Sequence, residues 1–248
     1  MKEAVRLSML IKKQALALGF DLVGISSVES YYGEAELFEK WLGSGYAGEM
    51  HYLERGLSKR ANLNAILPGA RSVISCAVNY NTENPRSTEV SGGGWISRYA
   101  WGDDYHDVME KMLGELADYV VDTCCEEIGV RAYVDTGPVL EKVHAQRSGV
   151  GWIGKNTCLI NQQVGSWLFL GEVITDIELE YDRTADDHCG TCTKCIDACP
   201  TDAIVEPYVV DARKCISYLT IEIKGKMPLE IREKVGNNGF GGDVCQDV

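Results

Sequence analysis

The segment that decides how this chain is organised is Cys189-Gly-Thr-Cys192-Thr-Lys-Cys195-Ile-Asp-Ala-Cys199-Pro200. Its spacing, C-x2-C-x2-C-x3-C-P, is that of modules in which three thiolates bind one iron–sulfur cluster and the fourth, just before proline, binds another. A structural zinc site is the alternative, but it usually needs two ligand pairs separated by a dozen or more residues. These four cysteines are too closely spaced for that. The segment therefore predicts two [4Fe–4S] clusters.

The cysteine count does not complete two clusters, because each cluster takes four thiolates. Of the ten cysteines in the chain, only Cys215 and Cys245 follow the four above. The other four are Cys76, Cys124, Cys125 and Cys158. Cys76 and Cys158 lie in apolar runs typical of strands, and we expect both to be small buried side chains.

Composition excludes several classes of protein. Of the 248 residues, 45% are hydrophobic and 25% charged, as in ordinary globular chains of one to two domains. The net charge of −13 argues against a protein that coats nucleic acid by bulk charge. The first apolar stretch is interrupted by Lys12 and Lys13, and no run approaches the roughly 18 apolar residues of a membrane span. We therefore expect a cytoplasmic protein without a membrane partner, whose clustered thiols bind metal.

Helical and strand patterns alternate up to about residue 180. The expected helices are 2–18, 34–42, 104–128 and 140–147, and the expected strands are 20–25, 71–80, 131–135, 158–160 and 167–175. We expect 71–80 to be a central strand and 83–94 to be a loop. The alternation predicts a layered fold, either α/β or α+β. The polar stretch 181–188 marks a boundary between a domain of residues 1–183 and an iron–sulfur module of residues 184–248.

A glycine motif, Gly149-Val-Gly151-Trp-Ile-Gly154, matches the dinucleotide fingerprint G-x-G-x-x-G. That fingerprint must follow a strand and open a helix. Here the preceding residues are helix-like and the following ones strand-like, so we reject the interpretation. We expect the glycines to permit an unusual backbone path beside a ligand, with Lys155 and Asn156 at a polar cofactor edge. A tight structural turn is the alternative.

Asp135 is the candidate acid of the chain. It ends an expected strand and is followed by Thr-Gly-Pro138. Desolvation in a pocket could raise the pKa of this carboxyl enough to make it a proton donor, whereas a turn-capping role is the alternative. Two basic sets could contact phosphates or be ordinary solvated faces. They are Arg55, Lys59, Arg60 and Arg71, and Lys224, Lys226, Arg232 and Lys234.

Seven ordered blocks cover nearly the whole chain and together resemble one family. They are residues 50–55, 98–106, 135–141, 151–157, 189–200, 215–222 and 240–246. The family is that of the epoxyqueuosine reductases, cobalamin-dependent iron–sulfur enzymes of tRNA queuosine synthesis. The resemblance implies an α+β fold, in which an α/β-type layered cobalamin-binding domain precedes a ferredoxin-like module with two [4Fe–4S] clusters. It also implies an external electron donor, with electrons passing through the clusters to cobalamin, which removes the epoxide oxygen of epoxyqueuosine at the tRNA wobble position.

The resemblance also assigns residues. Asp135 matches the proposed general acid and lies in the cobalamin pocket. Lys155, Asn156 and Ser217 match positions near the corrin, and Arg98, Tyr105 and His106 are further candidates. The resemblance implies cobalamin bound base-off. In agreement, the motif D-x-H-x-x-G of histidine-ligated cobalamins is broken at Met109.

The sequence departs from the family pattern F-G-C-D-x-C-Q-x-x-C-P. Gly242 stands at the first of those cysteines, and the sequence ends at Val248, one residue before the last. By family ligation, one cluster would then have Cys189, Cys192 and Cys195, and the other Cys199, Cys215 and Cys245. The helical repeat domain that helps the family hold tRNA is absent as well. We therefore expect a C-terminally truncated monomer with weakened tRNA binding.

Three alternatives stay open. One is a related cobalamin and iron–sulfur reductase that acts on a non-tRNA substrate. Another is a non-catalytic, ferredoxin-like electron carrier. The third is a flavin-binding, nitroreductase-like fold for the N-terminal domain, which the spectrum of the bound chromophore would distinguish.

Overall fold

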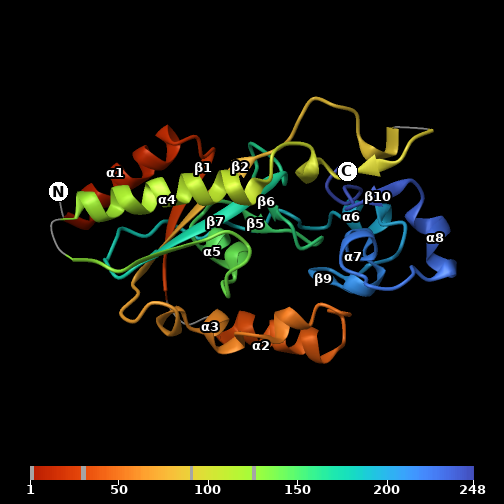
Figure 1. Cartoon of the computed structure of the whole chain (residues 1–248), viewed down its shortest axis with the longest axis horizontal. Helices are drawn as coiled ribbons and strands as arrows, with labels where there is room; N and C mark the ends of the chain where they lie inside the picture. The colour runs from red at the N-terminus through yellow and green to blue at the C-terminus, as the bar shows by residue number, and fades with distance from the viewer. Residues whose placement is uncertain (1–2, 29–31, 90–91, 125–126) are drawn as a thin grey trace.

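A four-stranded antiparallel sheet forms the centre of the computed structural model, which describes residues 3–28, 32–89, 92–124 and 127–248 (Figure 1). The strand order is β1 (Leu22–Ser27), β2 (Ser72–Asn79), β7 (Leu168–Thr175) and β4 (Val130–Tyr133). The expected strand 71–80 is thus central, as β2. Because every pair in this sheet is antiparallel, the intervening helices are not parallel crossovers, and the fold is α+β rather than α/β.

Two layers of helix cover the sheet. Helices α1 (Glu3–Ala17) and α4 (Tyr105–Thr123) lie side by side on one face, and α5 (Glu141–Arg147) packs on the other (Figure 1). Side chains alternate along β2, so Ile74 and Cys76 join the core with α1 and α4, whereas Ala77 packs with Ala145 of α5. Cys76 is therefore a buried core side chain, as expected.

Residues 32–67 form an arm at the edge of the molecule. It contains α2 (Tyr32–Gly43), a short 3-10 helix (His51–Glu54) and α3 (Leu57–Ala61), and it lies below the sheet in Figure 1. Leu63 and Leu67 anchor it against Val73 and Ile174 of the sheet. Trp41 reaches the cysteine-rich part, where its indole Nε1 donates to the Val210 carbonyl over 2.7 Å.

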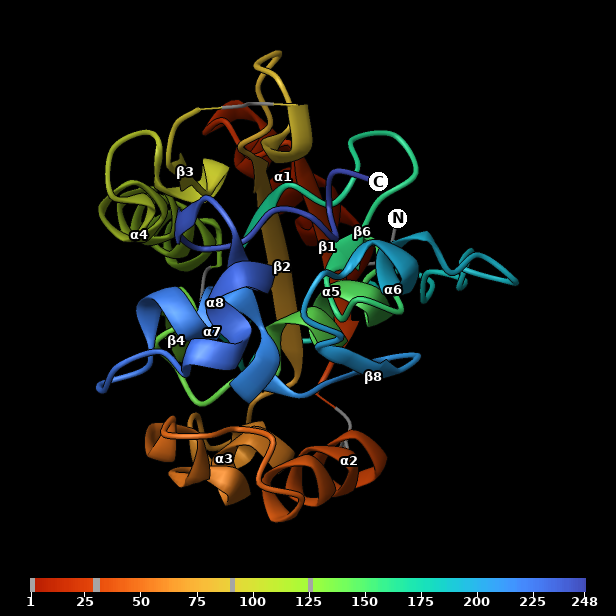
Figure 2. The ribbon, with the colours of Figure 1, turned by 90° about the vertical axis from the view of Figure 1, so that its right-hand side faces the viewer.

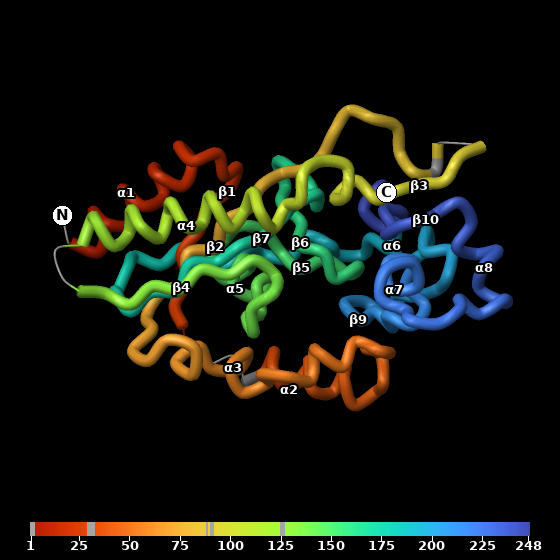
Figure 3. Tube along the Cα trace, viewed as in Figure 1, coloured from red at the N-terminus to blue at the C-terminus, as the bar shows by residue number. Residues whose placement is uncertain are grey.

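The cysteine-rich part lies at the far end of the molecule from the N-terminus, as Figures 1 and 3 show. Its elements are α6 (Lys194–Ala198), β8 (Ile204–Glu206), β9 (Val209–Val210), α7 (Ile216–Ile221), α8 (Leu229–Val235) and β10 (Asn238–Phe240). Figure 2 shows these elements from their own side, with the arm beneath. β10 pairs in parallel with β3 (Trp95–Ile96), so the segment before α4 is joined through its main chain to the cysteine-rich part.

The glycine motif leads from α5 into a hairpin. That hairpin consists of β5 (Trp152–Ile153) and β6 (Leu159–Ile160), so the order of elements is helix then strand, as expected. The expected helix 104–128 ends at Thr123, and residues 125–126 lie outside the described residues. The expected loop 83–94 holds one short 3-10 helix, Ser87–Glu89, and its residues 90–91 are likewise not described. Within the described ranges, no helix has both the length and the apolar character that crossing a bilayer requires.

Candidate functional site

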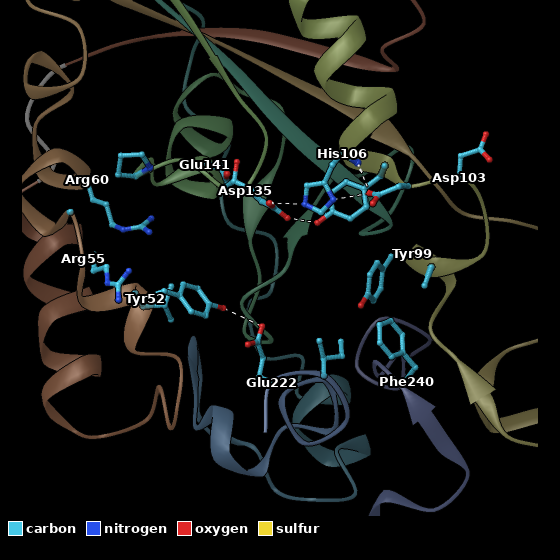
Figure 4. A pocket seen from close by; sticks show the side chains of 18 of the residues that line it. Tyr52, Arg55, Arg60, Tyr99, Asp103, His106, Asp135, Glu141, Glu222 and Phe240 are labelled. Atoms are coloured by element: carbon cyan, nitrogen blue, oxygen red, sulfur yellow. Dashed lines mark hydrogen bonds and ion pairs between the residues drawn. The ribbon is translucent and has the colours of Figure 1, made fainter. Parts of the chain in front are cut away.

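A cavity of about 1390 Å³ opens between the end of the sheet, the arm and the cysteine-rich part (Figure 4). Its walls come from segments far apart in sequence. They include Tyr52, Arg55, Lys59 and Arg60 of the arm, Tyr99 and 102–106 before and at the start of α4, Asp135, Thr136, Pro138 and Glu141 after β4, and Ile221, Glu222 and Phe240 of the cysteine-rich part. Small-molecule sites usually span about 300–1000 Å³, so this cavity suits a large cofactor or substrate.

Asp135 lies in this cavity at the end of β4 and has a strained backbone. Its φ of 37° lies in the left-handed region that non-glycine residues rarely adopt. The side chain is held on both oxygens: the Tyr105 hydroxyl donates to Oδ2, and Oδ1 lies 3.0 Å from Nε2 of His106. The carboxyl of Glu141 interacts electrostatically with Asp135. Tyr105 and His106 hold an acid, still partly exposed, in one orientation within the cavity.

Asp104 fixes His106 from the other side. It caps α4 by accepting from the His106 backbone N–H over 3.0 Å, and its Oδ1 lies 2.8 Å from His106 Nδ1. Desolvation lowers the pKa of His106, but the hydrogen bonds and charges of Asp104 and Asp135 outweigh it and raise this pKa. Burial, and then Asp135, raises the pKa of Tyr105. Both ring nitrogens of His106 thus face carboxylates, which leaves neither directed at a metal in the cavity.

Two further acidic groups interact in series with Asp135, Glu141 directly and Glu172 through Glu141, and sequence reasoning assigned neither of them a role. Burial, and then the charge of Asp135, raises the pKa of Glu141 to about 7. Glu172 of β7 is fully buried opposite Ser75, its two oxygens have no hydrogen-bond partner, and burial raises its pKa well above the ordinary value. A charged residue within an otherwise apolar strand was the available signal in the sequence for Glu172.

The arm contributes positive charge to the cavity. Arg55, Lys59 and Arg60 all line it, whereas Arg71 lies elsewhere and pairs with Glu178 over 3.4 Å. Across the cavity, the Tyr52 hydroxyl donates to Glu222 over 3.1 Å (Figure 4). Burial first, and then Glu222, raises the pKa of Tyr52 to about 12. The second basic set, 224–234, contributes no residue to the lining, and its Lys234 pairs with Asp202 over 3.0 Å.

The cysteines form two groups in space. Cys195 interacts electrostatically with Cys189 and Cys192. Cys245 interacts in the same way with Cys199 and Cys215, and also with Cys158. Cys189, Cys192 and Cys195 are the first cysteine group, and Cys199, Cys215 and Cys245 are the second. The interaction between the Cys158 and Cys245 thiols lowers the pKa of Cys158 to about 7. The expectation that Cys158 is merely a buried apolar side chain leaves out this contact.

Lys155 and Asn156, expected near a cofactor edge, contact the cysteine-rich part. Lys155 Nζ donates to the carbonyls of Gly190 and Cys192 over 2.7 and 2.9 Å. Asn156 Nδ2 donates to the Cys245 carbonyl over 3.0 Å. From the same hairpin, the Trp152 indole donates to Cys189 Sγ over 3.4 Å. The glycine motif therefore positions side chains that hold both cysteine groups.

Arg98 and Ser217 also lie outside the cavity lining. Arg98 is buried and donates to the carbonyls of Thr82, Asn84 and Pro85 over 2.9 to 3.1 Å. It also lies 3.7 Å from Asp247, so it ties a loop to the end of the chain. Of the residues predicted to contact the corrin, the structure brings Tyr105, His106 and Asp135 together in the cavity. Arg98, Lys155, Asn156 and Ser217 are not part of its lining.

The donor groups fit the cofactors implied by the sequence. Among the described residues, no three acidic, histidine or cysteine side chains are close enough to hold a single metal ion. A cubane cluster spreads its thiolates over a larger volume than one ion, and all-cysteine groups are its usual ligands. The cavity has the size for a corrin and lies against α7, which directly follows Cys215.

Comparisons with known proteins agree with this geometry. The family model of epoxyqueuosine reductase QueG, DUF1730, matches residues 60–136, and that of the 4Fe-4S double cluster binding domain matches residues 188–248. An epoxyqueuosine reductase of Cellulophaga algicola is 48% identical over 239 residues, which cover 96% of this chain and 77% of that protein.

Solved structures of the same enzyme are similar over the whole chain. A crystal structure of epoxyqueuosine reductase with a tRNA-Tyr epoxyqueuosine-modified tRNA stem loop has a TM-score of 0.88 at 35% identity and covers 97% of this chain. The Bacillus subtilis enzyme, with an aspartate-bearing catalytic loop swung out of the active site, has a TM-score of 0.87 at 34% identity and covers 98% of this chain. This chain spans 64% of the length of each of these two solved chains.

Proposed function

The chain belongs to the epoxyqueuosine reductase family of oxidoreductases, and on that premise we propose that it reduces epoxyqueuosine to queuosine in the tRNA anticodon. The reaction replaces the two C–O bonds of the epoxide by a C=C bond and releases the oxygen as water, consuming two electrons and two protons. We propose that it takes place in the cytoplasm, with an external electron donor.

The observation that carries the proposal is the orientation of Asp135. Tyr105 and His106 hold its carboxyl, at the wall of a cavity that extends to the cysteine-rich part. A positioned carboxyl of this kind acts as general acid. Asp135 would protonate the departing epoxide oxygen, and His106, whose pKa is raised, would return a proton to it.

Two cofactors complete the reaction. When bound, the [4Fe–4S] clusters supply single electrons, and cobalamin supplies the two-electron nucleophile that opens the epoxide. The cysteines of the 189–245 region would hold the clusters, and the residues lining the cavity would surround the corrin. Because His106 faces Asp104 and Asp135 through its two ring nitrogens, it would not bind the cobalt, in agreement with base-off binding.

The arm carries positively charged side chains that would bind the tRNA. Arg55 and Lys59 are exposed at the cavity, where they would contact backbone phosphates of the anticodon stem loop. The rest of this acidic chain would repel other nucleic acids.

Reconstitution tests the proposal directly. The chain is loaded anaerobically with iron, sulfide and cobalamin, reduced, and incubated with epoxyqueuosine tRNA, and queuosine is measured in the digested RNA. We expect queuosine to form, and we expect Asp135→Asn to lower its rate by about 10²–10⁴-fold, as for other general acids.

The same experiment separates the alternatives. A chain that binds no cobalamin would refute the cofactor assignment. An Asp135→Asn chain with unchanged reactivity would indicate a simple electron carrier, and a reactive chain that binds no tRNA at low salt would indicate a reductase for a different substrate.

A further inference from the structure

The second cysteine group, Cys199, Cys215 and Cys245, has a fourth thiol beside it that comes from outside the cysteine-rich segment. A [4Fe–4S] cluster takes four thiolates, and Cys199, Cys215 and Cys245 are three. Gly242 lies three residues before Cys245, where a C-x2-C pair would have its first cysteine, and glycine has no side chain that could bind iron. Cys158 lies in the turn of the β5–β6 hairpin, and its thiol interacts electrostatically with those of Cys245 and Cys215.

We propose that Cys158 is the fourth ligand of the cluster bound by Cys199, Cys215 and Cys245, in place of a cysteine at position 242. This inference rests on the double-cluster part of the proposed function and is independent of the tRNA substrate.

The chain positions Cys158 through one side chain that also holds Cys245. Asn156 is buried, with an exposed fraction of 6%. Its Oδ1 accepts from the Cys158 backbone N–H over 3.1 Å, and its Nδ2 donates to the Cys245 carbonyl over 3.0 Å. A single amide thus fixes the main chain at both cysteines, 87 residues apart by their numbers.

Hydrogen bonds also fix the turn before Cys158. Thr157 has a φ of 64°, in the left-handed region, and Gly154 donates to the Cys158 carbonyl over 2.8 Å. Lys142 Nζ binds the Thr157 carbonyl over 2.9 Å, so a cation lies beside the thiol. A positive charge at this point favours thiolates around a cluster.

Both groups of cysteines are tied to the same hairpin, but by different means. Trp152 and Lys155 contact the first group through an indole N–H and an ammonium group. Only the second group receives a thiol from it. In the sequence, Cys189, Cys192 and Cys195 follow one another at C-x2-C-x2-C spacing, whereas Gly242 stands three residues before Cys245 of the second group.

Position 242 lies close enough to the group for a substitution to test the exchange. A Cβ built on Gly242 would lie 3.0 Å from the Cβ of Ile216, the residue that follows Cys215, and 3.6 Å from the Ser217 backbone nitrogen. Its φ lies outside the left-handed region, so a side chain needs only a small adjustment of Ile216.

The test compares four chains reconstituted with iron and sulfide alone, without cobalamin or tRNA. They are the parent, Cys158→Ala, Cys158→Ala combined with Gly242→Cys, and Cys124→Ser as a control outside both groups. Iron and labile sulfide per chain and the EPR spectra before and after dithionite reduction are measured, and circular dichroism checks folding.

We expect Cys158→Ala to lose about four irons per chain or to convert that cluster to a three-iron form with its own EPR signal in the oxidised state. Gly242→Cys should restore the parent spectrum, and Cys124→Ser should match the parent. Unchanged iron content and spectra in Cys158→Ala would overturn the proposal. So would a loss that Gly242→Cys fails to restore, because that would indicate damage to the turn. These readouts do not depend on turnover, so an inactive chain with a Cys158-dependent cluster would refute the proposed function alone.

Discussion

The acid site depends on individual side chains that compensate for a strained residue. Asp135 adopts a φ of 37°, a conformation that costs of order 1–3 kcal/mol. The contacts of Tyr105 and His106 with its carboxyl help to hold it there. Gly137 makes room for this loop, because a Cβ there would overlap the ring of Tyr133. The strain is thus located at the residue that we assign to proton transfer.

Glu141 should make the stability of the fold depend on pH. Burial, followed by the charge of Asp135, raises its pKa from 4.5 to about 7, so the folded chain binds a proton that the unfolded chain releases. The stability that this bound proton contributes is fully present below pH 4.5 and is lost as the pH rises through about 7. Glu141→Gln keeps a neutral group of similar shape. It should therefore reduce the loss of unfolding free energy over this pH range by up to about 3 kcal/mol.

Thermal unfolding followed by circular dichroism across this pH range measures the effect. Glu110→Gln, an exposed carboxyl on α4, is the matched control and should retain the slope of the parent. A Glu141→Gln chain whose melting temperature falls with pH as steeply as that of the parent would contradict the assignment. Part of the slope should persist in any case, because Glu172 is also buried with a raised pKa.

At the scale of elements, the close contact between β1 and the end of α5 depends on one glycine. A Cβ on Gly24 would overlap the carbonyl oxygen of Ser148, a backbone atom that cannot move independently. Gly114, in the middle of α4, has no atom within 4 Å of such a Cβ. The two positions therefore form a matched pair with opposite expectations.

We expect Gly24→Ala to destabilise the fold by about 1–3 kcal/mol or more through overpacking. Gly114→Ala should instead stabilise it by about 0.5–1 kcal/mol, because alanine restricts the unfolded chain and favours helix. Urea unfolding of both variants measures the difference. Equal effects of the two substitutions would show that this packing of β1 against α5 is wrong.

For the molecule as a whole, charge is distributed so that recognition is local. The net charge is −13, yet the arm presents Arg55, Lys59 and Arg60 at the cavity. Arg60 also has a structural role, because its Nη1 donates to the Val139 carbonyl over 3.2 Å and its guanidinium lies over the ring of Phe38. Arg55 and Lys59 are therefore the cleaner targets for substitution.

Arg55→Gln combined with Lys59→Gln should weaken binding of an epoxyqueuosine anticodon stem loop. It should also reduce the slope of log K against log salt by about 0.7–0.9 for each phosphate that the protein no longer neutralises. Fluorescence anisotropy at several salt concentrations measures both quantities. Lys111→Gln, on α4 and outside the cavity lining, should leave the slope unchanged. If the double variant retains the parent slope, the arm does not contact phosphates.

Much of the architecture could be predicted from local pattern. The central strand β2, the helices α1, α4 and α5, and the order of helix and hairpin around the glycine motif follow from periodicity over a few residues. Strand direction could not be predicted in this way, because alternating elements are compatible with parallel and antiparallel pairing alike. The antiparallel register of β1, β2, β7 and β4 is fixed by contacts between residues 39 to 103 positions apart.

The sequence by itself determined the chemistry, because cluster-binding spacing and the Asp135 loop are encoded in short contiguous stretches. Only the tertiary structure decided which groups act together. Asp135 meets Tyr105 and His106 from 30 and 29 residues away, and the arm brings its cations to the same cavity. Cys158, in the turn before β6, is held near Cys245 because Asn156 bridges their main chains. These pairings depend on how distant segments pack, and no local spacing encodes them.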